Sequence, residues 1–332
     1  CNRTILSTSQ GTQCWSIRNI LNPKTLNMMK NIKYLGLALT ISFLNFSCDE
    51  EFLNAPPQGE VSESAVWTDP GLAEAFVTDL YKGLGQGGFS EQALASLTDE
   101  AIFTHPGRNI TTVTEARSNP QEPGWMDYTR NWPDLYSNLR ATNIAIDNLT
   151  DPSFANEGGI ADRLLGEATF MRAYFHHQLL RNFGGIPIAN KTFTLDEETY
   201  ELPRNTYEEV VDFIIEDLDQ AATLLAGKDL TGGRATELAA LALKSRVLIY
   251  AASDLHDMPT ASAKSSVISG YQHKELIGYT SGSQADRYQQ AAAAAKAVLD
   301  KASGNMLDLS EPLSQEEAIQ TYINNSLSRN GG

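Results

Sequence analysis

Residues Arg163–Ile188 form the sequence RLLGEATFMRAYFHHQLLRNFGGIPI, which has the pattern of a long buried helix. Its apolar residues recur every three or four positions, the spacing that places side chains on one face of an α-helix. They are Leu164, Ala168, Met171, Phe175 and Leu179. The pair Gly184-Gly185 follows, with Pro187 just beyond, and such residues end helices. We therefore expect a helix over about 160–183.

Helical spacing continues on both sides of this segment. Further helices are expected from Thr68 or Asp69 to the glycines at 83–87, and over about 127–149, 206–226, 236–252 and 286–301. The residues expected on their buried faces are, in chain order, Leu72, Phe76, Leu80 and Leu84; Trp132, Leu135, Tyr136, Leu139, Ile146 and Leu149; Val210, Ile214, Leu218, Ala221 and Leu225; Leu238, Leu241, Ala242, Leu248 and Ile249; and Tyr288, Ala292, Ala295 and Leu299.

The expected fold is mainly α, because the alternation typical of strands is nearly absent. Thr206 and Glu209 form a capping box that would start the helix at 206–226. Small residues, such as the run Ala291–Ala295, let helices approach closely, as in tetratricopeptide-like helix pairs. A strict 34-residue period is not visible.

Charge argues against nucleic acid as a partner. The chain has 41 acidic and 25 basic residues. Five of the basic residues and none of the acidic ones precede Cys48, so the remainder has 20 basic and 41 acidic groups, a net charge of −21. Such a surface repels phosphate backbones, whereas neutral ligands such as sugars are not repelled.

An export signal is expected at residues 29–47, MKNIKYLGLALTISFLNFS. Lys30 and Lys33 precede an apolar run of 13 residues, Tyr34–Phe46, which suits a signal peptide and is shorter than the roughly 20 residues that span a bilayer. Residues 1–28 are interpreted as upstream sequence that is not translated, with a genuine N-terminal extension as the alternative. The start would be Met28 or Met29.

Cys48 follows this signal directly and resembles the acylated cysteine of a bacterial lipobox, although Asn45-Phe46 departs from the strict motif. An incidental cysteine is the alternative. Lipidation would anchor the protein to a membrane, and the following acidic run resembles the signal for the outer leaflet of the outer membrane. Residues 48–67 would form a lipidated tether and 68–332 the helical domain. The other cysteines, Cys1 and Cys14, precede it, so we expect no cysteine-based zinc site and no cofactor.

Five segments in this order resemble the SusD/RagB family of outer-membrane nutrient-binding lipoproteins: 48–84, 132–149, 163–188, 204–225 and 233–253. The resemblance implies a SusD-like helical body with tetratricopeptide-like helix pairs and irregular loops. It also implies that the protein captures oligosaccharides or other nutrients and delivers them to a TonB-dependent, SusC-like transporter. Members are longer, so we expect the chain to be incomplete at its C-terminal side. Its ending, NNSLSRNGG, is expected to lack a closing helix or packed element.

The candidate ligand-binding segment is the irregular stretch Phe103–Arg130. It carries aromatic rings that could stack on sugars and polar groups that could bind hydroxyls: Trp125, Tyr128, Asn109, Arg108 and Asp127. As the alternative, Trp125 and Tyr128 anchor this loop to the helical body.

Enzymatic motifs are weak in this sequence, and we expect a binding protein. His176 and His177 are adjacent in a helix and point about 100° apart, unlike the paired histidines of a zinc protease. The neighbours Asp99 and Glu100 cannot face each other across a sugar. A surface-anchored glycoside hydrolase and a helical-repeat surface assembly module are the alternatives.

Overall fold

The structure, a computed structural model, describes residues 63–85, 94–102, 104, 110–119, 121–122, 124, 132–194, 201–228, 230, 232–302 and 314–327. All of them belong to one compact unit, Val61–Gly332. The expected signal peptide, Cys48 and most of the tether lie outside the described residues. No helix in the described ranges is both long and apolar enough to cross a bilayer.

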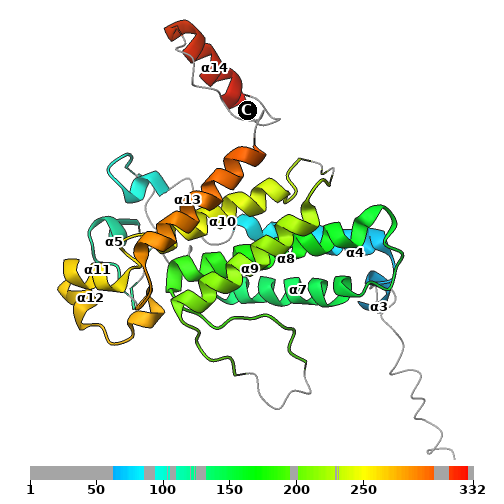
Figure 1. Cartoon of the computed structure of the whole chain (residues 1–332), viewed down its shortest axis with the longest axis horizontal. Helices are drawn as coiled ribbons and strands as arrows, with labels where there is room; N and C mark the ends of the chain where they lie inside the picture. Colours follow the sequence, from blue (N-terminus) through cyan, green and yellow to red (C-terminus); the bar gives the residue numbers. More distant parts are fainter. Residues whose placement is uncertain are drawn as a thin grey trace, which may run out of the picture. The chain divides into compact units, whose positions relative to one another are not determined.

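Most of the described residues are helical, which confirms the expected fold class (Figure 1). The longer helices are α4 (Pro70–Leu80), α7 (Trp132–Thr150), α8 (Ile160–Phe183), α9 (Tyr207–Leu225), α10 (Glu237–Ala252), α13 (Gln284–Lys301) and α14 (Gln315–Leu327). The short ones are α3 (Glu63–Val66), α5 (Ile110–Thr114), α11 (Met258–Lys264) and α12 (Ser266–Gly270), with 3-10 turns η1 (Tyr81–Gly85), η2 (Leu94–Leu97), η3 (Glu157–Gly159) and η4 (Lys274–Leu276). In these ranges, β-structure is limited to an isolated bridge between Asp257 and Tyr279.

Helix α8 lies at the centre of the helical body, between α7 and α9, and also contacts α4 (Figure 1). Helix α9 packs in turn against α10, and α10 against α13. Each of these long helices therefore contacts the next one, the arrangement expected of stacked helix pairs. All five residues of the predicted α8 stripe are completely buried: Leu164, Ala168, Met171, Phe175 and Leu179.

The predicted helix ends are confirmed by local contacts. Asp69, and not Thr68, caps α4 by accepting hydrogen bonds from two backbone amides of its first turn. Thr206 and Glu209 form the expected capping box of α9. Gly184 ends α8 at a positive φ of 71°, and a Cβ there would clash with the carbonyl oxygen of Leu276. A glycine is therefore required where α8 stops.

The predicted buried face of α13 is wrong, and that of α10 is only partly right, since Leu238, Leu241 and Leu248 are half-buried. In α10, Ile249 is 48% exposed and Ala242 is exposed, whereas Ala240, Leu243, Val247 and Ala251 are buried. In α13, Tyr288, Ala292, Ala295 and Leu299 are all exposed, and Arg287 and Ala291 are buried. Apolar and small residues occur around most of the circumference of both helices. Periodicity alone therefore cannot select the buried side, which is set by contacts of α10 with both α9 and α13.

Two smaller corrections apply to the ends of the domain. Leu72, predicted to be buried in α4, is 36% exposed, because Ala73 and Val77 face the core instead. The expectation that the chain ends without a helix is also wrong, since α14 covers Gln315–Leu327. Its start is stabilised locally: Ser314 and Glu317 form reciprocal hydrogen bonds of the capping-box type. Its described side chains are mostly exposed. The helix therefore has no buried apolar face from which it could have been predicted.

Candidate functional site

The residues predicted to bind ligand all lie outside the described residues. These are Trp125, Tyr128, Asn109, Arg108 and Asp127. Within the same stretch, α5 is described, and Ile110 and Thr112 in it are buried. The structure therefore neither places nor excludes the predicted sugar site. The lipidation site Cys48 is outside the described residues as well.

A cavity of about 450 Å³ opens between α8, α10 and the first turn of α9. Buried residues from three segments line its inner part: His177 of α8, Tyr207 of α9 and Val247 of α10. The exposed residues Arg181, Arg246, Tyr250 and Leu255 also line it. Small-molecule sites in proteins have volumes of roughly 300–1,000 Å³, so this cavity is large enough to hold a sugar-sized ligand.

An aromatic pair forms part of the cavity wall. The rings of Tyr207 and His256 are stacked, with centroids 4.4 Å apart and an interplanar angle of 18°. The Nδ1–H of His256 donates a hydrogen bond to the carbonyl of Ile277 at 2.8 Å, which fixes the imidazole. Burial lowers the pKa of His256 and raises the pKa of the Tyr207 hydroxyl. Both rings are therefore neutral near pH 7, and this part of the wall is rigid and uncharged.

The neighbouring histidines of α8 have different environments. His176 is completely buried, and its Nε2 accepts a hydrogen bond from the Ala189 amide while Nδ1 donates to the Arg172 carbonyl. His177 is only 6% exposed, and its Nδ1 is buried without a hydrogen-bond partner among the described residues. The two rings serve different contacts, as expected from the 100° offset between adjacent helix positions.

Burial keeps His177 neutral. Its pKa is lowered to about 4, mainly by removal from water, and the positive charges of Arg181 and Arg246 act in the same direction. An orphaned buried nitrogen is unusual in a folded protein, because it gives up its hydrogen bond to water without replacement.

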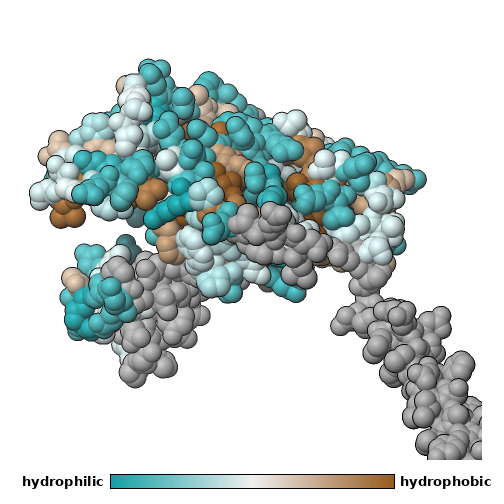
Figure 2. Space-filling view, turned by 90° about the horizontal axis from the view of Figure 1, so that it is seen from below, coloured by the Kyte–Doolittle hydropathy of each residue, from teal (hydrophilic) through white to brown (hydrophobic). Residues whose placement is uncertain are grey.

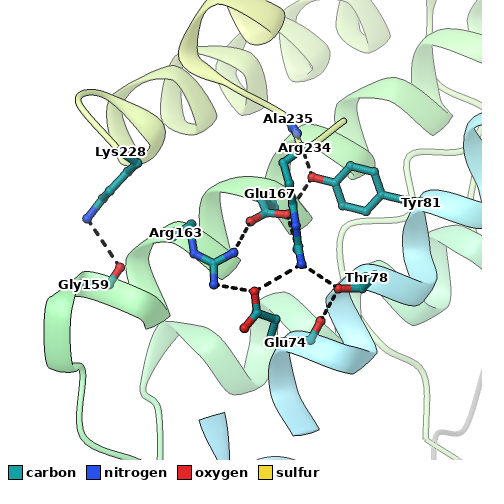
Figure 3. A network of polar contacts seen from close by, with 9 residues as sticks. All are labelled: Glu74, Thr78, Tyr81, Gly159, Arg163, Glu167, Lys228, Arg234 and Ala235. Carbon is teal, nitrogen blue, oxygen red and sulfur yellow. Dashed lines mark hydrogen bonds and ion pairs between the residues drawn. The ribbon is translucent and has the colours of Figure 1, made fainter. Parts of the chain in front are cut away.

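A second group of charged residues connects α4, α8 and the segment before α10 (Figure 3). The fully buried Glu167 carboxylate accepts hydrogen bonds from Arg163 Nη1 and Arg234 Nη1, each at 2.9 Å. The hydroxyl of Tyr81 donates to it at 2.6 Å. The same two arginines contact Glu74, at 2.7 and 3.2 Å.

Every charged group of this network has a partner within it. The Tyr81 hydroxyl accepts a further hydrogen bond from the Ala235 amide at 2.8 Å, and burial raises its pKa, so it stays protonated. We interpret the network as structural, since its two carboxylates and two guanidinium groups neutralise one another and link the three segments.

Known proteins similar to this chain identify its family. A SusD-like family model, described as starch-binding and associating with the outer membrane, matches residues 52–249. The chain belongs to the SusD-like family. This finding confirms the resemblance seen in the sequence. The family is thus one of glycan-binding proteins associated with the outer membrane.

This SusD-like chain matches only part of its curated relatives. It is 23% identical to a SusD-like protein of Formosa agariphila over 68% of this chain and 43% of the relative. It is also 23% identical to a SusD-like protein of Bacteroides ovatus, over 65% of this chain and 39% of the relative. The chain therefore spans about two-fifths of the length of these relatives.

Solved structures support the same fold. A SusD-like protein from Bacteroides fragilis is 26% identical and superposes with a TM-score of 0.50, over 65% of this chain and 41% of that chain. A SusD homolog from Bacteroides thetaiotaomicron is 18% identical, with a TM-score of 0.54 over 80% of this chain and 46% of that chain. At 18% identity, the similarity to the second structure supports a shared fold and nothing more.

The cavity of this SusD-like chain was not predicted from its sequence. His177, Tyr207 and Arg246 are far apart along the chain, and only the packing of α8, α9 and α10 brings them together. One ion pair of the charged network could have been predicted from the sequence, because Arg163 and Glu167 are four residues apart on a helix. The described residues contain no group of three or more His, Cys, Asp and Glu side chains that could hold a metal ion.

Proposed function

We propose that this protein captures oligosaccharides at the cell surface and delivers them to a TonB-dependent, SusC-like transporter of the outer membrane. The observation that carries the proposal is the match of a starch-binding, outer-membrane-associated family model to residues 52–249. The helical body supports it, since solved SusD-like proteins share this fold. The strongly acidic chain also favours neutral sugars over polyanions as ligands in general.

The proposed anchor is Cys48. Acyl chains on its sulfur would insert into the membrane, each buried CH₂ contributing about 0.8 kcal/mol, and residues 48–67 would connect the anchor to the helical domain. A flexible tether of this kind keeps the domain at high local concentration near a transporter and still lets it swing open. The proposed movement is that of a hinged lid, open to load the ligand and closed to trap it against the transporter.

The proposed sugar site is the segment Phe103–Arg130. Trp125 and Tyr128 would stack on the apolar faces of sugar rings, and Arg108, Asn109 and Asp127 would bind hydroxyl groups. We propose binding without turnover. A bound oligosaccharide should emerge intact after long incubation with the purified protein, as followed by chromatography; hydrolysis would favour the glycosidase alternative.

Affinity purification tests the transport role. The protein, expressed from its own gene with an internal tag, is purified from detergent-solubilised outer membranes, and a large β-barrel protein is expected to co-purify. Replacing Cys48 by Ala should abolish labelling by a fatty-acid analogue and move the protein out of the membrane fraction. If no large β-barrel co-purifies, the delivery role fails. If labelling persists in the Cys48→Ala variant, the anchor is elsewhere.

A further inference from the structure

Exposed apolar side chains gather where the end of α10 meets the start of α13. The two helices run antiparallel: Gln284 at the start of α13 donates a hydrogen bond to the carbonyl of Ala252 at the end of α10, and an ion pair joins their other ends. About one turn inward from the first contact lie Ile249 and Tyr288, which are 48% and 42% exposed. Both side chains therefore leave apolar area in water on neighbouring helices.

Two further residues extend this surface to the cavity between α8 and α10. Tyr250 follows Ile249 on α10, Leu255 lies just beyond the end of that helix, and both line the cavity and are more than half exposed. We call Ile249, Tyr250, Leu255 and Tyr288 the α10–α13 patch. Figure 2 shows one face of the molecule, on which hydrophilic residues predominate and hydrophobic ones form small separate patches. Single exposed apolar residues are normal on a protein, whereas a cluster of large ones marks an interaction site.

Helix α14 also has an exposed apolar face. Ile319 and Ile323 are four residues apart, so they lie on one side of the helix, and they are 53% and 40% exposed. With 13 residues, α14 is in the range of lengths at which an isolated helix is only marginally stable in water. Its capping hydrogen bonds stabilise the first turn alone. The helix therefore needs a packing partner for Ile319 and Ile323 in order to be stable.

The connection between α13 and α14 is long enough for α14 to reach the α10–α13 patch. Residues 302–314 separate the two helices, and a chain of that length spans at most roughly 40 Å. Helix α13 has 18 residues and is therefore about 27 Å long, so α14 can fold back along it to the patch at its start. Such a short connection holds α14 at a roughly millimolar effective concentration near the patch. A second molecule of the protein does not reach that concentration in dilute solution.

Charge favours the same direction of α14 on the patch. The helix has Glu316 and Glu317 in its first turn. When α14 folds back from the end of α13, this acidic turn lies towards Arg246, which is exposed on α10 one turn before the patch. The acidic residues at the patch, Asp254 and Asp286, then lie at the other end of α14. Opposite charges are thereby brought together and like charges are kept apart.

From these observations we propose that α14 docks on the α10–α13 patch of its own chain. Ile319 and Ile323 pack against the four apolar residues of the patch, and the acidic first turn lies beside Arg246. The docked helix forms an antiparallel pair with α13 and covers Tyr250 and Leu255 at the mouth of the cavity. Access to the cavity then depends on whether α14 is docked or released.

Hydrogen exchange of the whole chain, followed by mass spectrometry, tests this docking. The quantity measured is the exchange rate of the α14 amides, and the variants compared leave α14 itself unaltered. Ile249→Asp places a charge in the patch and should speed the exchange of α14 by about tenfold or more, because the helix loses the apolar contact that holds it. Arg246→Gln should speed it by a smaller factor, about two- to fivefold, as expected for an exposed ion pair.

Val267→Asp provides the matched control. Val267 is an exposed apolar residue of α12, outside the patch, and the same substitution there should leave the exchange of α14 unchanged. The amides of the central helix α8 report on the folding of the domain, and their exchange should be the same in all variants.

Three results would overturn the proposal: exchange of α14 as fast as in an unfolded peptide, the same α14 rate in Ile249→Asp as in the unaltered chain, or an equal effect of Val267→Asp. Measurements at low and high protein concentration identify the occupant of the patch. Protection of α14 that is independent of concentration supports docking within one chain. Protection that rises with concentration, together with a dimer in analytical ultracentrifugation, would show that a second copy occupies the patch and would contradict the proposal.

Discussion

Replacing Glu167 by Gln tests whether the network in Figure 3 holds the domain together. The Glu167 carboxylate is completely buried and accepts three hydrogen bonds, from Arg163, Arg234 and Tyr81. Gln has nearly the same shape, but its amide nitrogen would face another donor, and one of the two negative charges beside the arginines would be lost. Breaking a buried ion pair by removing one partner costs about 3–5 kcal/mol.

We expect the lower end of this range. Glu74, which is 37% exposed, still contacts both arginines in the variant and compensates part of their charge. The predicted loss in unfolding free energy is therefore about 3 kcal/mol. In urea, with an m-value of about 2–3 kcal/mol/M, the midpoint should move down by roughly 1–1.5 M. Circular dichroism at the helical minimum follows the transition.

Two controls make this result interpretable. Glu216→Gln changes the same group at an exposed position of α9 and should alter stability by less than about 0.5 kcal/mol. In a double-mutant cycle, Arg234→Met in the Glu167→Gln background should cost clearly less than Arg234→Met alone, because the pair is already broken. A loss below about 1 kcal/mol for Glu167→Gln, or additive effects in the cycle, would refute the structural role of the network.

Three further predictions follow from the structure and the proposed site. Gly184→Ala should destabilise the domain by about 1–3 kcal/mol, because alanine would be strained at a positive φ and would clash with the Leu276 carbonyl; Gly270→Ala, in open space, should not, and thermal unfolding compares the two. Burial lowers the pKa of His177 from 6.5 to about 4, so as pH falls this histidine is protonated in the unfolded chain before it is protonated in the folded one. The contribution of neutral His177 to the free energy of unfolding is therefore complete above pH 6.5 and is lost towards pH 4, by up to about 1.4 kcal/mol per pH unit. Urea titrations at several pH values in this range give the free energy of unfolding as a function of pH. This pH dependence should be weaker in a His177→Gln variant, and a pH dependence identical to that of the unaltered protein would contradict the assignment. Trp125→Ala should weaken oligosaccharide binding by about 1–3 kcal/mol, by analogy with base stacking, with folding intact; loss of folding instead would mean that Trp125 anchors the loop.

Local features of the sequence determined where the helices lie. The stripe of α8, the capping box at Thr206 and the glycine pair at 184–185 act through neighbours within a few residues, and their structural outcome matches the expectation. The family resemblance rests on the same segments, because their order along the chain is itself sequence information. The predicted sugar-binding residues, such as Trp125, stay predictions since they lie outside the described residues.

Only the tertiary structure decided which faces are buried and where the charges meet. Helices α10 and α13 are apolar or alanine-rich on most sides, so the buried side depends on where neighbouring helices pack. Glu167 and Arg234 are 67 residues apart, and the cavity joins three helices. A contact between distant residues depends on the relative placement of whole helices, and the spacing of residues within one helix carries no information about that placement.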